Sequence, residues 1–152
     1  MKNRRKAREL ALRAYYALEM SKNDVEQTLT DMIYSRNEID EDIITFACNL
    51  VRRATQRQDE FDQLIKEKAL NWDFNRIAVL DKLILRIAIC EFLTFEDIPP
   101  KVSIDEAIEI SKKYSTEKSG QFINGILDSV LNDLKKQNRI VKSGRGLVDE
   151  TI

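Results

Sequence analysis

Residues 76–95 read RIAVLDKLILRIAICEFLTF, and this stretch decides the fold. On a helical projection its apolar side chains fall on every face, and its interior is interrupted only by Asp81, Lys82, Arg86 and Glu91. A helix that is apolar all round is normally buried by neighbours on several sides. The length would suffice to cross a bilayer, but ionisable side chains in the middle make that arrangement costly. We therefore expect a central buried helix. Lys82 and Arg86 should share a solvent-facing strip, and Glu91 should face a neighbouring helix or a bound partner.

The distribution of glycine and proline indicates the same fold class. Residues 1–98 contain neither, the two prolines are Pro99 and Pro100, and the glycines are Gly120, Gly125, Gly144 and Gly146. Tight turns with positive φ need glycine and proline breaks helices, so this scarcity predicts helices joined by polar connectors. A chain of 152 residues with 34% charged and 43% hydrophobic residues is typical of one compact globular domain.

The spacing of apolar residues predicts the individual helices. We expect one helix over residues 4–20 and a second over 24–35. The spacing over 40–70 is compatible with one long helix or with two helices broken near 55–58. The polar and aromatic stretch 71–75 is then expected to join an N-terminal helical subdomain, 1–71, to a C-terminal one, 72–136.

Capping residues mark the helices that follow the two prolines. Ser103 and Glu106 have the spacing of a capping box, which predicts a helix start there. Ser115 or Thr116 is expected to cap the last helix. Residues 137–152 lose the helical periodicity and hold two of the four glycines, so we expect a frayed tail.

The sequence argues against an enzyme and against a metal or cofactor site. It contains no histidine, which removes the usual general base near neutral pH and the commonest metal ligand. Cys48 and Cys90 stand far apart in apolar helical stretches, as buried reduced thiols would. No Gly-rich phosphate loop and no nucleophile with a plausible base is recognisable. The N-terminus lacks the apolar core of a secretory signal, so we expect a cytoplasmic protein.

A basic cluster at the N-terminus is the strongest functional signal. Its members precede the first acidic residue, Glu9, and are Lys2, Arg4, Arg5, Lys6 and Arg8. Cations at a helix N-terminus destabilise the helix by a few tenths of a kcal/mol each, so a polyanion is the natural compensating partner. Five contacts to single-stranded RNA would give a slope of log K against log salt of about −3.5. Tyr15 or Tyr16 could stack on an unpaired base, or both could pack between helices. The alternative for the cluster is a solvated basic tag.

A second, weaker group of cations follows the two prolines. It comprises Lys101, Lys112, Lys113 and Lys118, with Phe122 at the start of the last helix. Lysines on a helix more often form only a solvated face, so this pattern alone is unspecific. Gly125 lies inside a helical run at a cost of roughly 1 kcal/mol relative to alanine. We interpret it as a site of close helix approach, with ligand access as the alternative.

Three segments resemble the NusB family of bacterial transcription antitermination factors. They are RRKARELALRAYYALEM, LDKLILRIAICEFL and IPPKVSIDEAIEISKKYSTEKSGQFINGILDSVL, in the same order over residues 4–134. The resemblance implies an all-α fold of two small helical subdomains packed around a central buried helix. It also implies binding of the single-stranded boxA element of ribosomal RNA leaders, together with the ribosomal protein NusE, in the antitermination complex of RNA polymerase.

The resemblance further implies roles for particular residues. The arginine-rich N-terminus that contacts RNA carries over to Arg4, Arg5, Lys6 and Arg8, and the aromatic contacts carry over to Tyr16 and Phe122. Lys101, Lys112 and Lys118 complete the expected RNA-binding set. The surface expected to bind NusE is placed at Asp81 and Asn75.

Two departures from the family pattern and two alternatives accompany this interpretation. Lys118 stands where some relatives have an acidic residue, which could strengthen RNA binding or shift its preference. The stretch beyond Asn138 matches no part of the pattern. One alternative is a NusB-like RNA-binding module related to the N-terminal part of ribosomal RNA cytosine methyltransferases. The other is a helical adaptor that binds only protein.

Overall fold

The computed structural model of the chain describes residues 3–36 and 39–151, with the backbone only over 148–151. All regular elements in these ranges are helical, and the chain divides into two compact units, Met1–Gln56 and Arg57–Ile152. This division comes one helix earlier than the boundary expected at residue 71. The helix α4 (Gln58–Lys68) belongs to the second unit because it packs on α5 and α7, with Phe61 and Ile65 buried.

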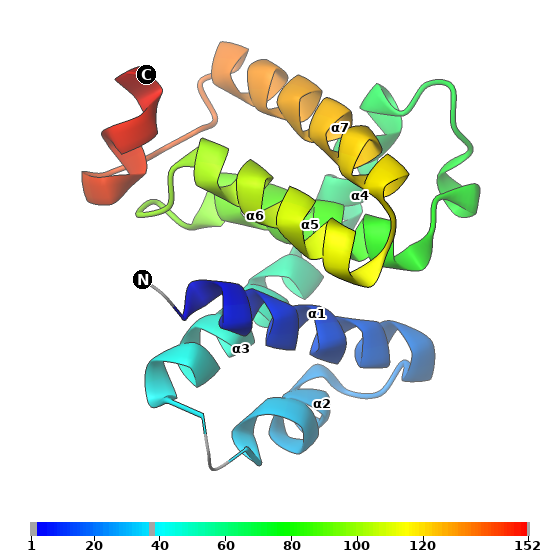
Figure 1. Ribbon diagram of the computed structural model, residues 1–152, viewed down its shortest axis with the longest axis vertical. Coiled ribbons are helices and arrows are strands. Elements are labelled where there is room, and N and C mark those ends of the chain that lie inside the picture. Colours follow the sequence, from blue (N-terminus) through cyan, green and yellow to red (C-terminus); the bar gives the residue numbers. More distant parts are fainter. Residues whose placement is uncertain (1–2, 37–38, 152) are drawn as a thin grey trace. The chain divides into compact units, whose positions relative to one another are not determined.

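The first unit is built on the packing of α1 (Arg4–Ser21) against α3 (Glu41–Gln56) (Figure 1). Several buried positions of α1 are alanine, which lets two helix backbones approach closely. The chain leaves α1 at Lys22 in a left-handed conformation, and α2 (Val25–Leu29) follows, with Asp24 accepting a 3.1 Å bond from the Gln27 amide. This is an ordinary N-cap.

A π-helical turn, Thr30–Tyr34, continues α2. One arginine of α3 forms hydrogen bonds to both elements. Arg52 of α3 donates to both carboxylate oxygens of Glu26, at 2.8 and 2.9 Å, and to the Tyr34 hydroxyl at 3.0 Å. The bond between Arg52 and Glu26 lowers the pKa of Glu26 and raises that of Arg52. The free thiol Cys48 is buried in the same unit, and burial raises its pKa.

The stretch 40–70 forms two helices and not one. The backbone leaves helical geometry at Arg57, inside the window in which a break was expected, and α4 begins at Gln58. The connector from α4 to α5 then contains a short 3-10 turn, Phe74–Arg76, capped by Asp73.

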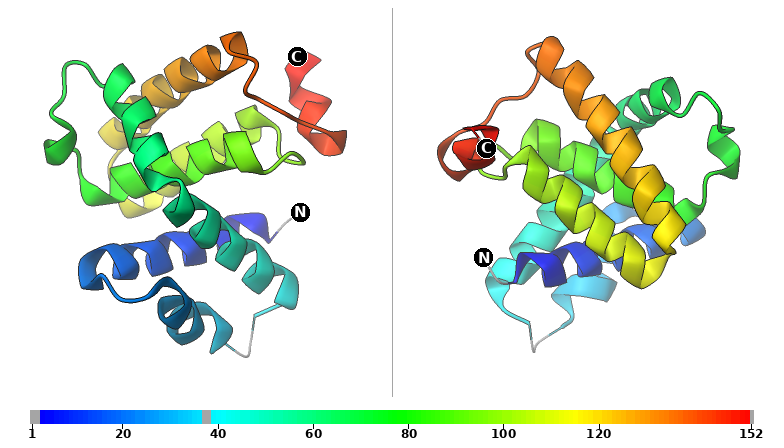
Figure 2. Two further views of the ribbon diagram at one scale, coloured as in Figure 1. Left: turned by 180° about the vertical axis from the view of Figure 1, so that it is seen from behind. Right: turned by 45° about the horizontal axis from the view of Figure 1, so that its top comes forward.

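The second unit surrounds α5 (Val79–Thr94) with α4, α6 (Pro100–Tyr114) and α7 (Glu117–Lys136) (Figure 2). Nearly every side chain from Leu83 to Phe92 is buried, so the expected central buried helix in an all-α protein is confirmed. No helix among the described residues is both long and apolar enough to cross a membrane.

The charged residues of α5 are partnered inside the unit. Arg86 is buried and binds both carboxylate oxygens of Asp62, at 2.7 and 2.8 Å, so the solvent-facing strip expected for it is wrong. Only Lys82 stays partly exposed, with its ammonium 4.5 Å from the Phe74 ring centre. Glu91 does face a neighbouring helix.

The expected capping box at Ser103 is wrong, because Ser103 lies inside α6 and not at its start. The Ser103 hydroxyl donates to Glu91 Oε1 at 2.7 Å, and α6 already begins at Pro100. Proline is favoured at the first helical position because its fixed φ suits the helix and its missing N–H needs no partner there. At the next connector the expected cap holds, since Thr116 Oγ1 accepts a 3.2 Å bond from the Ser119 amide.

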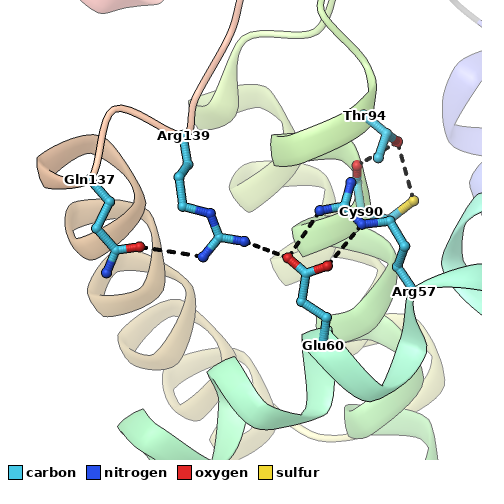
Figure 3. Close-up of polar contacts among 6 residues, drawn as sticks. All are labelled: Arg57, Glu60, Cys90, Thr94, Gln137 and Arg139. Carbon is cyan, nitrogen blue, oxygen red and sulfur yellow. Dashed lines mark hydrogen bonds and ion pairs between the residues drawn. The ribbon is translucent and has the colours of Figure 1, made fainter.

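The residues after α7 are tied to the rest of the second unit, in contrast to the expected frayed tail. Glu60 of α4 binds Arg57 at 2.9 Å and also Arg139, which in turn bonds Gln137 at 3.3 Å (Figure 3). The Arg57 bond is the main reason why the pKa of Glu60 is lowered.

Further along, this segment caps α5. The Lys142 ammonium donates to the carbonyls of Glu91, at 3.0 Å, and Phe95, at 2.7 Å, at the C-terminal end of α5. The Glu91 carbonyl also accepts a 3.3 Å bond from the Phe95 amide, and the Phe95 carbonyl accepts one from the Ile98 amide, so Lys142 adds a cationic donor to carbonyls at the negative end of the helix. The Ser143 amide bonds the Glu96 carbonyl at 3.0 Å, and a 3-10 helix, Gly144–Thr151, follows.

Candidate nucleic-acid and partner interfaces

The N-terminal cations of α1 fall into two groups. The Phe46 ring of α3 holds two of them, with the guanidinium carbons of Arg4 and Arg8 at 4.4 and 5.5 Å from its centre. Arg8 is only 4% exposed. Arg5 and Lys6 are exposed, and Lys2 lies outside the described residues. Arg5 and Lys6 are therefore accessible to a ligand, whereas Arg8 is not.

The exposed face of α1 continues beyond this cluster. Tyr15 is buried, whereas Tyr16 is 41% exposed, so only Tyr16 can present its ring to a ligand. Arg13 is exposed as well, and it lies seven residues, nearly two turns, after Lys6. Arg13 was not among the residues predicted from the sequence, although its spacing of seven from Lys6 and of three from Tyr16 could have indicated it.

The lysines of the second unit lie at two separate places. Lys101 is in the first turn of α6, beside a groove of about 320 Å³ that Asp105, Asn124 and Asp128 also line. Lys112 is in the last turn of α6, about 16 Å further along the helix, and pairs with Glu109 at 3.5 Å. The structure thus separates two lysines that the sequence analysis grouped together.

Lys118 and Phe122 of α7 line a cavity of about 200 Å³ together with Asp81 of α5. Lys118 and Phe122 were predicted to bind RNA, and Asp81 was predicted to bind the protein partner. Asn75 is exposed in the preceding 3-10 turn, and its amide donates to Asp73 at 3.0 Å. Its neighbour Arg76 reaches the same cavity.

Within this cavity Asp81 is 7% exposed. Its Oδ2 accepts a 2.9 Å bond from the Ser119 hydroxyl, and its buried Oδ1 has no hydrogen-bond partner among the described residues. Trp72 forms one wall, with its ring edge-on to Phe122 at 5.2 Å between centres.

Besides the apolar Ile77 and Ala78, three residues with polar or aromatic side chains line the cavity and were not predicted from the sequence. They are Trp72, Arg76 and Ser119. Trp72 was interpreted as part of a joint between subdomains, yet it is 61% exposed. A lone tryptophan in a polar connector was the available signal. For Ser119 there was none, because its role depends on a helix 38 residues away.

None of the described residues form a cluster of histidine, cysteine or acidic side chains that could hold a metal ion. The geometry offers exposed cations, exposed aromatic rings and one incompletely bonded carboxylate. Such groups bind phosphates, bases and protein side chains.

Known proteins of similar sequence indicate the family of this chain. The NusB family model matches residues 5–132. The transcription antitermination protein NusB of Salinibacter ruber is 47% identical over 97% of this chain and 92% of its own length. The corresponding protein of Chloroherpeton thalassium is 44% identical, over 97% of this chain and 70% of its own length.

Solved structures give the same result. NusB from T. maritima superimposes with a TM-score of 0.79 at 37% identity, covering 86% of this chain and 91% of that one. A structure of the antitermination factors NusB and NusE in complex with dsRNA gives a TM-score of 0.79 at 22% identity over 88% of this chain and 98% of that one, a likeness of fold. With a family match over most of its length and close relatives of that name, the chain belongs to the NusB family of transcription antitermination proteins.

Proposed function

We propose that this protein is an RNA-binding transcription antitermination factor that binds boxA-type single-stranded RNA of ribosomal RNA leaders together with NusE. It acts in the cytoplasm as part of the antitermination complex of RNA polymerase. The close relatives carry the name of transcription antitermination proteins over most of their own length, which favours this function over a methyltransferase-associated module. One protein of the same fold forms a complex with NusE and dsRNA, which supports NusE and RNA as the classes of partner.

The exposed face of α1 is the observation that carries the RNA-binding part. Arg5 and Lys6 contact phosphates, and Tyr16 stacks on an unpaired base. Arg4 and Arg8, held by Phe46, add to the positive potential of the same helix end. In the second unit Lys112 and Lys118 give further phosphate contacts, as does Lys101 at its separate position. Asp81 and Asn75 belong to the surface that binds NusE.

The test is fluorescence anisotropy of a labelled boxA-like RNA across a salt series, with and without NusE. Because each phosphate contact to a single strand contributes about 0.7 to the salt slope, replacing Arg5 and Lys6 by alanine should flatten the slope by about 1.4. The double variant Lys136→Ala/Arg145→Ala is the control, since it removes two exposed positive charges from the second unit. An unchanged slope in the Arg5/Lys6 variant would reject the proposed RNA surface.

Tyr16 provides an independent test of base stacking. Tyr16→Ala should weaken RNA binding by about 1–3 kcal/mol, the usual contribution of one aromatic stack. The thermal midpoint should stay close to that of the wild type, because the ring is largely exposed. If Tyr16→Leu, which retains apolar area without an aromatic ring, binds as tightly as the wild type, stacking is not the contact.

A further inference from the structure

The connector between α4 and α5 presents large apolar side chains to solvent. Trp72, which lines a cavity, is 61% exposed, and Leu70, which lies outside that cavity, is 83% exposed. Tryptophan is enriched among the residues that contribute most to protein–protein binding, and exposed apolar groups around a cavity mark interaction sites. Trp72 is also the only tryptophan of the chain, and it forms the wall of the 200 Å³ cavity.

The cavity contains a carboxylate whose hydrogen bonding is incomplete. Asp81 lines it and is more than nine-tenths buried, with Ser119 as the donor to one oxygen. The other oxygen, Oδ1, is buried and accepts no hydrogen bond within residues 3–36 and 39–151. A buried carboxylate oxygen without a donor is costly, so a ligand that brings an N–H group into the cavity is favoured.

The charges around the cavity favour a cationic group at its base. Arg76 and Lys118 also line it, but both are exposed, so salt and water screen them. The Asp81 carboxylate is buried and is screened much less. A phosphate placed against this buried carboxylate would be repelled, so a cationic protein side chain is the better fit inside the cavity. The exposed ammonium of Lys118 can still contact an RNA phosphate outside the cavity.

We propose that this cavity receives an arginine side chain of the protein partner, which stacks on Trp72 and donates hydrogen bonds to Asp81. This inference rests on the proposed function, because it assigns a chemistry to the surface that binds NusE. Arginine fits better than lysine for two reasons. Its planar guanidinium stacks on aromatic rings, and it presents several N–H donors in a fixed plane to a carboxylate. The Trp72–Phe122 pair supplies the aromatic surface.

The experiment is calorimetric titration of NusE into the 152-residue chain and its variants. Trp72→Ala and Asp81→Asn should each weaken binding about tenfold or more, as expected for central contact residues. Trp72→Phe should retain most of the affinity, because an aromatic face remains. Leu70→Ala is the matched control on the same connector and should change affinity less than about threefold, since Leu70 does not line the cavity.

A substitution series in NusE identifies the inserted residue. Each arginine of NusE is changed to lysine in turn. One of these NusE variants should bind the wild-type protein about tenfold more weakly than unchanged NusE does. The same NusE variant should bind Asp81→Asn almost as well as unchanged NusE does, because the two substitutions remove the same contact. Trp72 fluorescence, with Trp72→Phe as the blank, should shift on binding of wild-type NusE and shift less with that variant.

The outcomes separate this inference from the proposed function. If NusE does not bind the wild-type protein, the proposed function fails and the inference fails with it. If NusE binds the wild type, Trp72→Ala and Asp81→Asn equally well, only the inference is overturned. Loss of RNA affinity in Trp72→Ala without loss of NusE affinity would assign the cavity to a nucleobase and also overturn it. If Asp81→Asn fails to fold, Trp72→Ala and the NusE series still give the answer.

Discussion

Residues that are close in the sequence of this protein can differ completely in their exposure to solvent. Arg5 and Arg8 belong to one basic run, yet Arg5 is exposed and Arg8 is buried beside Phe46. Tyr15 and Tyr16 differ in the same way. Adjacent residues of a helix point about 100° apart, so a basic or aromatic run gives a binding surface only where it faces solvent.

The buried ion pair of Arg86 and Asp62 makes a stability prediction. Arg86→Ala leaves the carboxylate of Asp62 unpaired in a poorly solvated place, so it should lower the free energy of unfolding by about 3–5 kcal/mol. Urea denaturation measures the change. The double variant Arg86→Met/Asp62→Leu should recover much of the loss, because replacing both charges leaves none uncompensated. A double variant as unstable as Arg86→Ala would contradict this account.

The helices of the second unit are held at their ends by contacts that only partly follow from sequence. Thr116 caps α7 as expected, whereas α6 begins at Pro100, so Ser103 lies inside the helix and its hydroxyl donates to Glu91. Lys142 caps the C-terminal end of α5 from a segment without helical periodicity. A capping motif therefore marks a helix start only where the helix does not already begin upstream.

Replacing Gly125 of α7 and Gly146 of the following segment by alanine should change the stability in opposite directions. A Cβ at Gly125 would meet nothing within 4 Å in the described part of the chain, so close helix approach does not explain this glycine. Gly125→Ala should raise stability by about 0.5–1 kcal/mol through helix propensity alone. Gly146→Ala should lower it, because the new Cβ would lie 1.9 Å from the Glu96 carbonyl oxygen. Thermal denaturation compares the two, and equal effects would contradict the packing described.

The contacts of Glu60 predict a dependence of stability on pH. Its pKa is lowered in the folded state, chiefly by the Arg57 hydrogen bond, so the unfolded state binds the proton more readily. The stabilisation is therefore present above the usual pKa of about 4.3 and is lost as the pH falls through the lower folded value. Glu60→Gln should be less stable than the wild type at neutral pH, and the difference should shrink as the solution is made acidic. If the difference in stability between Glu60→Gln and the wild type stayed the same from neutral to acidic pH, the stabilising role of the Glu60 carboxylate would be refuted.

Taken as a whole, the chain consists of two compact units whose boundary follows packing and not composition. The polar stretch 71–75 resembles a boundary, but α4 before it contributes Phe61, Ile65 and Asp62 to the second unit. A change of composition marks a connector, whereas the limits of a unit depend on which helices bury each other's apolar faces.

This division predicts the behaviour of fragments. A fragment of residues 57–152 should unfold cooperatively on heating, because it retains α4, α5, α6 and α7. A fragment of residues 72–152 should not, since it loses the apolar side chains of α4 and leaves Arg86 buried without Asp62. Calorimetry on both fragments tests this, and cooperative unfolding of the shorter one would place the boundary at residue 71 after all.

The sequence by itself determined that the protein is all-helical, that the stretch 76–95 contains a buried central helix, and that the chain resembles the NusB family. The structure limits that helix to Val79–Thr94. These features follow from local periodicity and hydrophobicity, which each segment carries in its own residues. Only the tertiary structure decided which cations are exposed and which carboxylates are paired. Arg86 meets Asp62 across 24 residues, and Asp81 meets Ser119 across 38. Such partners are chosen by how helices pack, and no spacing within one segment encodes that choice.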